Sequence, residues 1–316
     1  MANISHQRKG FSGKVHGFSR PTQLPESDEQ ARAWQEANRL WWEQAPMRYD
    51  WRVEINAKRG TADYFTEIDR RFFEAVAHYM PWKSRPFDSL IDYAMLRDKD
   101  VLEIGVGHGS HAQLIAPFCR RYVGIDLTRT AVEMTRLRLS TNGIVGNVIQ
   151  MDAEQMSFPN EAFDFIWSWG VIHHSANTKN ILLEMRRILR PGGSAVVMVY
   201  HRSPWKYYVM DGFFKGLMLG GLFRDFSLHR VSQRATDGAI ARYYTIQEWK
   251  DLCAGVLCVE GIAIKGQKSD LIPLPAGGLK DAIGRWLPDA ACRFLTDRLR
   301  LGSFLLATMR TPSSLP

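Results

Sequence analysis

A glycine-rich segment, Glu103-Ile-Gly105-Val-Gly107-His-Gly109, follows a short apolar run of the sequence. Glycines at a turn between a strand and a helix let a ligand lie against the main chain. The spacing GxGxG differs from the GxGxxG of dinucleotide-binding turns. Glu103 is a poor neighbour for a pyrophosphate but a good hydrogen-bond acceptor for an ammonium group. The segment therefore favours S-adenosylmethionine over NAD as the ligand.

Two further carboxylates follow the next two apolar runs. Asp126 ends one run and precedes Leu127, and Asp152 follows the other and precedes Ala153. The carboxyl ends of parallel strands meet at one crevice of an open α/β sheet, where ligands bind. A carboxylate at Asp126 can accept both hydroxyls of a ribose, and an adenine edge would lie near Asp152. Either residue alone could be a helix cap or a loop residue, but the ordered set predicts one binding site.

Histidine and tyrosine side chains follow two more apolar runs. His173 and His174 come after the fourth run, and Tyr200 and His201 come after the fifth. The pKa of histidine suits proton transfer near neutral pH, so these residues are candidate general bases or substrate contacts. Each could instead anchor a loop. A reaction at a soft or already acidic nucleophile needs orientation and desolvation, and it can proceed without a base.

The alternation of apolar runs with helical periodicity predicts the scaffold that positions these residues. The expected strands are 101–104, 122–125, 147–150, 163–167, 194–199, 258–264 and 303–309. The expected helices are 27–42, 62–79, 110–119, 128–139, 178–189 and 245–255. This order is typical of a parallel sheet with right-handed crossovers, and the last two strands indicate one antiparallel edge strand.

Residues 99–200 resemble the class I S-adenosylmethionine-dependent methyltransferases, in the subgroup similar to the ubiquinone and menaquinone biosynthesis methyltransferases (methyltransferase type 11). The resemblance lies in VLEIGVGHG, YVGIDLT, MDAEQMSFPNEAFDFIWSWGVIHHS and LLEMRRILRPGGSAVVMV. It implies an α/β, Rossmann-like, mostly parallel seven-stranded sheet with an antiparallel edge strand, an N-terminal helical cap and two insertions. The expected division is a flexible basic arm over 1–25, the cap over 26–90, and a methyltransferase domain over 91–316 with insertions at 202–243 (a lid) and 270–300.

The resemblance also implies roles for single residues in binding S-adenosylmethionine. Gly105, Gly107 and Gly109 would approach the methionine part of the cofactor, and Glu103 would lie near its amino end. Asp126 would bind the ribose, with Leu127 in the same site. Asp152 and Ala153 would bracket the adenine, and Trp169 would touch the cofactor through its main chain. His108 stands where the family usually has a small or polar residue; we expect it and His111 to cap the turn or face solvent.

Candidate substrate contacts lie outside this central region. Tyr49 belongs to an aromatic stretch that would either cover the active site or pack in the core. Tyr208 and Phe214 belong to the 202–243 insertion, which is both apolar and basic. This combination suits a lipophilic or anionic small-molecule substrate, or a contact with a membrane surface. A buried helix with a solvated basic face would have the same composition.

The net charge of +8 is uneven along the chain. Residues 21–200 carry −2, whereas 1–20, 201–245 and 265–316 carry +4 each. The basic excess is thus a feature of the acceptor side, and we do not expect a nucleic-acid partner. Enzymes that methylate amino groups of nucleic-acid bases carry the motif [DNS]-P-P-[FY] after the fourth strand. This chain has Trp167-Ser-Trp-Gly170 there, which argues against that activity. The four cysteines have no zinc-ligand spacing, so no metal is expected.

These features predict an enzyme that transfers a methyl group from S-adenosylmethionine to an oxygen or carbon of a small molecule. No apolar leader and no spanning segment are recognised, so a cytoplasmic location is expected. One alternative is an RNA or tRNA methyltransferase that uses the basic arm and lid as a phosphate-binding surface. Another is a cofactor-binding partner subunit without catalytic activity.

Overall fold

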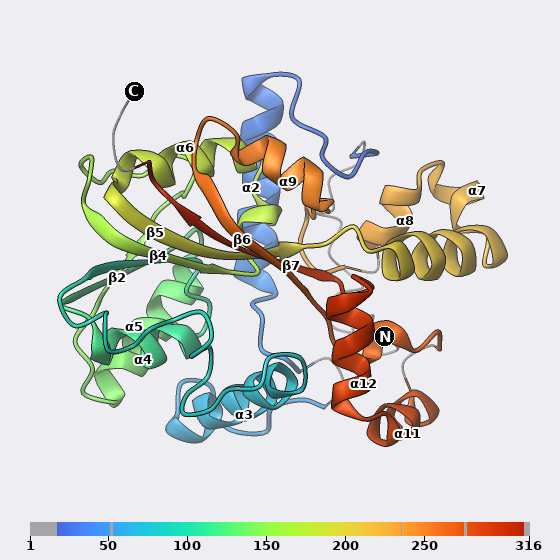
Figure 1. The fold of residues 1–316 in the computed structure, drawn as a ribbon, viewed down its shortest axis with the longest axis horizontal. Helices are drawn as coiled ribbons and strands as arrows, with labels where there is room; N and C mark the ends of the chain where they lie inside the picture. The colour runs from blue at the N-terminus through green and yellow to red at the C-terminus, as the bar shows by residue number, and fades with distance from the viewer. Residues whose placement is uncertain (1–17, 51–52, 235, 275–276, 313–316) are drawn as a thin grey trace.

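The computed structural model describes residues 18–50, 53–234, 236–274 and 277–312. One sheet has the strand order β3-β2-β1-β4-β5-β7-β6 (Figure 1). The strands are β1 (Asp100–Ile104), β2 (Arg121–Asp126), β3 (Asn147–Gln150), β4 (Phe163–Trp169), β5 (Leu189–Tyr200), β6 (Cys258–Lys265) and β7 (Phe304–Arg310). Strand β7 is antiparallel to both β5 and β6, between which it lies, and β1 to β5 pair in parallel. The predicted α/β, Rossmann-like fold is confirmed.

Helices cover both faces of the sheet (Figure 1). On one face lie α3 (Ala62–Tyr79), α4 (Ser110–Ile115), the 3₁₀ turn η1 (Ala116–Phe118) and α5 (Arg129–Thr141); on the other lie α6 (Thr178–Ile188) and α9 (Ile246–Cys253). Side chains of a strand alternate between faces. Along β1, Val101 therefore joins one apolar core cluster, and Leu102 and Ile104 join the other. Both cores pack against the central strands and hold their carboxyl ends at one edge.

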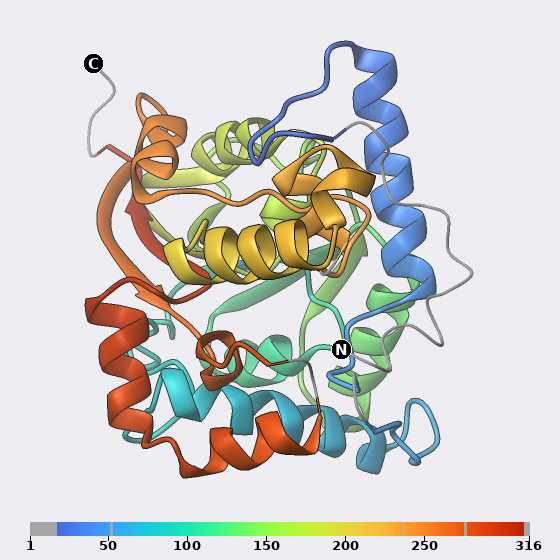
Figure 2. The ribbon, with the colours of Figure 1, turned by 90° about the vertical axis from the view of Figure 1, so that its right-hand side faces the viewer.

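Helix α2 (Asp28–Gln44) forms an upright element beside the sheet (Figure 2). Its first turn is capped by the Ser27 hydroxyl, which accepts a hydrogen bond from the main chain of Gln30. The residues before it pack against the 202–243 insertion, since Phe18 is fully buried beside His229. Residues 18–25 of the expected flexible arm are therefore held in place, and 1–17 lie outside the described residues.

Arg242 holds this N-terminal segment to the rest of the fold. Its guanidinium is fully buried and donates hydrogen bonds to the main-chain oxygens of Gln23, Ser175 and Ala176. Burial lowers the pKa of Arg242. The ordinary pKa of an arginine guanidinium lies far above neutrality. The arginine thus satisfies three carbonyl groups that come from two loops far apart in the sequence.

Both predicted insertions are largely helical. The first contains the π-helix η3 (Pro204–Met218), α7 (Gly221–Asp225) and α8 (Leu228–Arg234). The second contains α10 (Lys268–Leu271), α11 (Gly278–Trp286), α12 (Asp289–Arg293) and the π-helix η4 (Phe294–Arg298). They project on the same side of the molecule, which faces the reader in Figure 2. Among the described residues, no helix has the length and hydropathy needed to cross a bilayer.

Candidate active site

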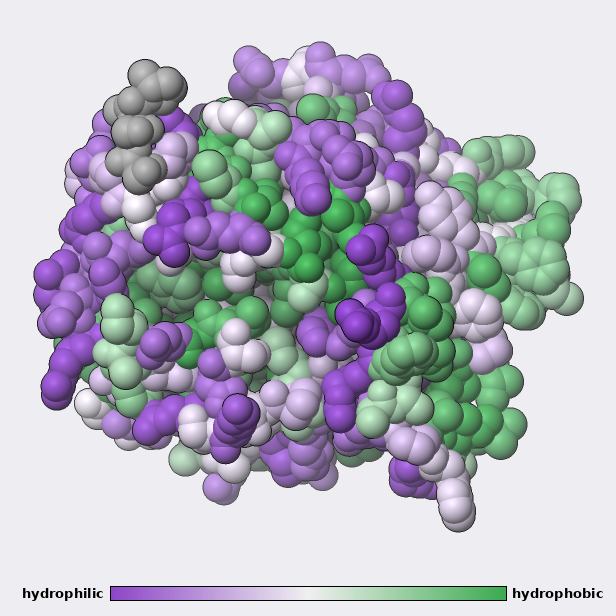
Figure 3. Space-filling model, viewed as in Figure 1, coloured by the Kyte–Doolittle hydropathy of each residue, from purple (hydrophilic) through white to green (hydrophobic). Residues whose placement is uncertain are grey.

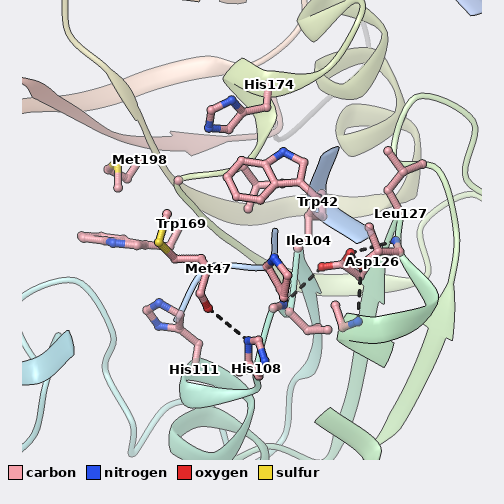
Figure 4. Close-up of a pocket in the computed structure, with 18 of the residues that line it drawn as sticks. Trp42, Met47, Ile104, His108, His111, Asp126, Leu127, Trp169, His174 and Met198 are labelled. Carbon is pink, nitrogen blue, oxygen red and sulfur yellow. Dashed lines mark hydrogen bonds between the residues drawn. The ribbon is translucent and has the colours of Figure 1, made fainter. Parts of the chain in front are cut away.

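A large cavity opens at the carboxyl ends of β1, β2, β4 and β5 (Figure 4). It contains about 1590 Å³ of non-atom space, counted together with its open mouth. Helices α2 and α3 close the cavity on one side, with Trp42, Met47 and Phe72 among its walls. The carboxyl ends of the strands thus form the floor of the cavity, and the N-terminal helices form its cover.

The glycine turn after β1 forms one wall of this cavity. Gly105 has φ +82°, and a Cβ there would lie 2.3 Å from the side chain of Val171. Gly107 has φ +53°, and a Cβ there would meet no atom within 4 Å. Because both line the cavity, their bare main chain is exposed to it. Gly109, with φ +79°, precedes α4 and packs on Thr135 outside the cavity wall.

Glu103 does not line the cavity. The pleat of β1 directs its side chain to the face covered by α4 and α5, where it is 1% exposed. The Tyr122 hydroxyl donates to its Oε2 over 2.6 Å, and its Oε1 has no partner among the described residues. Burial raises the pKa of Glu103 to about 8. The structure thus places this carboxyl behind the cavity wall, and its contact with a cofactor ammonium group stays a prediction.

Asp126 ends β2 at the cavity wall, and Leu127 lines the cavity beside it (Figure 4). One carboxylate oxygen accepts from the Gly107 main-chain nitrogen at 3.2 Å. The other accepts from the main-chain nitrogen and hydroxyl of Thr128, at 2.9 and 2.8 Å. Burial raises the pKa of Asp126, whereas these three hydrogen bonds oppose that shift. The carboxylate is therefore fixed in orientation and still borders the cavity.

Asp152 and Ala153 line the cavity after β3, and α2 holds this loop in place. The Gln35 side-chain amide donates to Asp152 Oδ1 at 2.9 Å, and its oxygen accepts from the Ala176 nitrogen at 3.0 Å. One turn further along α2, Asn38 also lines the cavity, and its buried Oδ1 has no partner among the described residues. Sequence reasoning missed Gln35 and Asn38. Their spacing with Trp42, at positions i, i+3 and i+7 of one helix, was the available signal.

Trp169 ends β4 and forms an aromatic wall with Trp167 of the same strand, Phe87 of the loop between α3 and β1, and His111 of α4. Its ring stacks on Trp167 at 5.3 Å between centroids and an angle of 6°. Phe87 contacts it edge-on at 4.7 Å, and His111 lies 6.0 Å away. His111 lines the cavity, and burial lowers its pKa to about 3. It is therefore neutral near pH 7 and does not face bulk solvent, contrary to one of the two expectations.

His108 is buried at the base of the cavity cover. Its Nδ1 donates to the main-chain oxygen of Met47 at 3.1 Å, since a carbonyl can only accept. Its Nε2 lies 3.1 Å from the Tyr64 hydroxyl, which donates to the neutral ring. Burial lowers the pKa of His108 to about 4. This histidine therefore joins the glycine turn to α3 and to the segment after α2. The expectation was that it caps the turn or faces solvent, and this connecting role differs from both.

The histidine and tyrosine candidates fall into two groups. His174, in the 3₁₀ turn η2 (Ile172–His174), and Tyr200 line the cavity. His173 is fully buried behind them, with neither ring nitrogen partnered among the described residues, and burial lowers its pKa. His201 Nδ1 donates to the Gly302 main-chain oxygen at 2.8 Å, away from the cavity. His173 and His201 are thus not placed to contact a ligand in this structure.

We call the part of the cavity around His174 and Tyr200 its second end; Figure 4 shows Trp42 between His174 and Asp126. The His174 Nδ1 donates to the Ile240 main-chain oxygen at 2.6 Å, which leaves Nε2 as an acceptor. Burial lowers the pKa of His174 to about 4 and raises the pKa of Tyr200 above its ordinary value. Tyr49 also lines this cavity and stacks on Phe72 at 5.0 Å. Other residues of this end, which sequence reasoning did not select, are Tyr79, Met198, Gln267 and Phe304.

Two predicted substrate residues lie elsewhere. Tyr208 is 47% exposed and Phe214 is 36% exposed, and neither lines the cavity. Both belong to η3, whose outer face points away from the sheet.

Trp51, from the same aromatic stretch as Tyr49, lies outside the described residues. Within the described ranges, no cluster of three or more metal-ligating side chains occurs.

The strand order, with the glycine turn and Asp126 together at the carboxyl ends of the strands, defines a Rossmann-like domain. Residues 102–197 match the family model described as "Methyltransferase domain". The resemblance seen in the sequence is thereby confirmed, and the chain carries a domain of the methyltransferase family. A structure of the Haloferax volcanii Trm112 methyltransferase activator with its methyltransferase has the same fold, with a TM-score of 0.52 and 16% identity, covering 82% of this chain and 100% of that one.

Curated relatives match mainly in the central region. The chain is 33% identical over 109 residues to a fatty-acid O-methyltransferase of Mycolicibacterium smegmatis, which covers 34% of this chain and 39% of that protein. It is 30% identical over 110 residues to a ubiquinone biosynthesis O-methyltransferase of Roseobacter denitrificans, covering 35% and 44%. It is 26% identical over 172 residues to a tRNA U34 carboxymethyltransferase of Methylococcus capsulatus, covering 48% and 53%. The chain therefore spans about half or less of the length of these relatives.

Proposed function

We propose that the chain transfers the methyl group of S-adenosylmethionine to an oxygen or carbon of a small, largely apolar acceptor. The observation that carries the proposal is the two-ended cavity. One end has the bare glycine turn and Asp126, and the other has His174 and Tyr200 among apolar side chains. The bound cofactor would supply an electrophilic methyl group, and this chain's residues would bind, orient and desolvate the two reactants.

The cofactor end fits S-adenosylmethionine in its donors and acceptors. A Cβ at Gly107 would extend into free cavity space, so glycine leaves room for a ligand against the main chain. Asp126 is a fixed acceptor for the ribose hydroxyls, and Asp152 borders the place of an adenine. The unpaired Oδ1 of Asn38 offers a further acceptor, because a buried polar atom without a partner is costly unless a ligand satisfies it.

The acceptor end combines apolar walls with two groups that can orient a hydroxyl. The His174 tautomer presents an unprotonated Nε2, and its lowered pKa keeps the ring neutral at pH 7. A ring nitrogen of this low basicity accepts a hydrogen bond from an acceptor hydroxyl, and it is a weak base before the methyl transfer. Tyr200 keeps its proton because its pKa is raised, so it can donate to an acceptor oxygen.

The relatives support an apolar acceptor more than a polynucleotide. Two of them are named for O-methylation of a fatty acid and of a ubiquinone precursor, and both are acceptors with long or large apolar parts. The acceptor end here is lined by Tyr79, Met198 and Phe304. The similarity to a tRNA-modifying enzyme keeps tRNA as the second acceptor to be tested.

The experiment has two arms. Calorimetric titration with S-adenosylmethionine and with S-adenosylhomocysteine tests the cofactor end; no binding of either would contradict the proposal. Transfer of a labelled methyl group to free fatty acids, to hydroxylated prenyl-phenols and to bulk tRNA tests the acceptor end. We expect label in an apolar fraction and none in tRNA. Labelling of tRNA that persists at high salt would show that the acceptor class is wrong.

A further inference from the structure

Two helical segments expose large apolar side chains to solvent. We call residues 208–226, on η3 and α7, the first apolar tip, and residues 279–299, on α11 to η4, the second apolar tip. Phe223 and Phe226 of the first tip are 74% and 85% exposed, and Trp286 of the second is 88% exposed. The other exposed members are Tyr208, Phe213, Phe214, Leu217, Met218, Leu219, Leu279, Ile283, Phe294 and Leu299.

These exposed side chains are not scattered over the molecule. Across the described ranges, every exposed large aromatic side chain belongs to one of the two tips, whereas elsewhere single residues such as Leu24, Met95 and Val145 are exposed. Scattered exposed apolar residues are ordinary, but concentrated ones mark a binding surface. Figure 3 shows apolar residues gathered over both projecting parts at the same end of the molecule.

The two tips lie on one side of the protein, as Figures 1 and 2 show. Short chain segments connect them to the acceptor end of the cavity. Tyr200, a cavity residue, is followed by Ser203, whose hydroxyl caps η3. Gln267, another cavity residue, directly precedes α10, and α10 contacts η3. The acceptor end of the cavity is therefore flanked by the segments that lead into both tips.

Basic side chains accompany the apolar ones. Arg285, Arg298 and Arg300 are exposed beside the second tip, and Lys206 lies at the start of η3. None of the four has a carboxylate partner among the residues the structure describes. By contrast, Lys215, Arg224 and Arg234 pair with Asp211 or Asp225. Three of these cations, Lys206, Arg285 and Arg298, lie on helices that carry the two tips, whereas Arg300 lines a pocket against β6.

We propose that this side of the protein docks on the surface of an anionic lipid bilayer. Aromatic and aliphatic side chains at helix ends enter the boundary between headgroups and acyl chains, and Lys and Arg meet the lipid phosphates. A second copy of the chain is disfavoured as the occupant, because a symmetric contact would bring the same cations together. The tips belong to two separate parts of the chain that project on this side, as Figure 1 shows.

The docking surface goes beyond methyl transfer and can be tested without it. Sedimentation with vesicles of phosphatidylcholine alone, and of phosphatidylcholine with phosphatidylglycerol, measures the partition of the protein. We expect binding to the mixed vesicles that weakens with salt, and little binding to the neutral ones. Equal partition to both, or none to either, would overturn the proposal, whatever the cofactor titration shows.

Substitutions locate the contact. The double variant Phe223→Glu/Phe226→Glu and the single variant Trp286→Glu, one on each tip, should each weaken partition by about tenfold or more. The matched control is Val145→Glu, which alters a side chain that is 91% exposed in the turn before β3 and should bind as the unaltered protein does. Unchanged partition of both tip variants would contradict the proposal. So would a dimer, detected by sedimentation equilibrium, that these same substitutions dissociate.

Discussion

The Nδ1 atom of His108 lies 3.1 Å from the main-chain oxygen of Met47, so the glycine turn is directly joined to the cover of the cavity. The same imidazole ring reaches α3 through the Tyr64 hydroxyl. Because Met47 itself lines the cavity, loss of this connection should affect ligand binding as well as folding. One neutral side chain thus couples the cofactor wall to the N-terminal helices.

Tyr64→Phe tests this connection. Removing the hydroxyl leaves His108 Nε2 buried without a donor, which should cost about 1–2 kcal/mol of unfolding free energy. Affinity for S-adenosylmethionine should fall several-fold, since the cover is less well held. Urea denaturation and calorimetric titration measure the two effects. Tyr93→Phe is the control, because its hydroxyl donates to Pro86 outside the cavity. Equal loss of affinity in both variants would show that His108 has no special part in the cover.

Asp126→Asn tests the predicted ribose contact. An amide keeps the shape but replaces one acceptor with a donor and removes the charge, so affinity for S-adenosylmethionine should fall by about 10²-fold. Asp98→Asn, an exposed carboxylate near the opposite end of the strands, should leave the affinity unchanged. Calorimetric titration of both variants measures the difference. An Asp126→Asn protein that binds as tightly as the original would rule out the ribose assignment.

His174→Gln and Tyr200→Phe test the acceptor end. Both residues lie at the cavity but apart from the glycine turn, so cofactor affinity should be retained. Loss of one orienting hydrogen bond should lower kcat/KM for the acceptor by about tenfold to 10²-fold. His173→Gln is an unsuitable control because that ring is fully buried; His78→Gln, at the surface, is better. If these variants lose affinity for S-adenosylmethionine and keep their kcat/KM for the acceptor, the two ends of the cavity are wrongly assigned.

Six histidines make stability depend on pH below neutrality. Burial lowers the pKa of each of His108, His111, His173, His174, His201 and His229. The unfolded chain takes up protons near pH 6.5, whereas the native state takes them up at lower pH, near pH 3 to 4 at His108, His111, His174 and His229. The contribution of these histidines to stability is therefore full above about pH 6.5 and falls as the pH decreases, by up to about 1.4 kcal/mol per pH unit for each histidine.

Urea denaturation between pH 7 and pH 5 measures this slope. His111→Leu removes one titrating group from an apolar site, so its slope should be smaller by about 1.4 kcal/mol per pH unit. If His111→Leu has the same slope as the unaltered protein, this buried histidine is not a cause of the acid sensitivity.

Glu103 has the opposite effect above neutrality. Its pKa is raised by burial to about 8, so the native state keeps a proton that the unfolded state has lost above about pH 4.5. Stability should therefore fall with rising pH up to about pH 8, by about 1.4 kcal/mol per unit. Glu103→Gln carries a neutral side chain at every pH and should be flat between pH 7 and 8. Urea denaturation at both pH values measures the free energy of unfolding. If its change between pH 7 and pH 8 is the same for both proteins, the pKa of Glu103 is not raised.

The strand ends and the cofactor wall could be predicted because their signals are local. A glycine turn and a carboxylate such as Asp126 stand directly after apolar runs, and parallel topology brings those ends together. Glu103 belongs to the same motif as Gly105, but its side chain is buried away from the cavity, and the motif alone does not show this.

The acceptor end could be predicted only in part, because it is assembled from distant segments. Gln35 meets Asp152 across more than a hundred residues, and Tyr79, Gln267 and Phe304 come from separate elements. No short-range pattern marks these partners. The aromatic residues of η3 could be recognised as unusual for a loop, but their composition fits a buried wall and an exposed surface equally well. The sequence therefore predicts Tyr208 and Phe214 as substrate contacts, whereas the structure places both outside the cavity lining.

Arg242 has a consequence for the order in which the chain acquires its native form. The guanidinium that fixes Gln23 is 219 positions further along the chain, and Phe18 packs on the same side chain. During synthesis from the ribosome, the segment before α2 must wait until Arg242 has emerged. The early residues therefore remain unanchored while the central strands are made, and a nascent chain stalled before position 242 should be cleaved by protease ahead of α2.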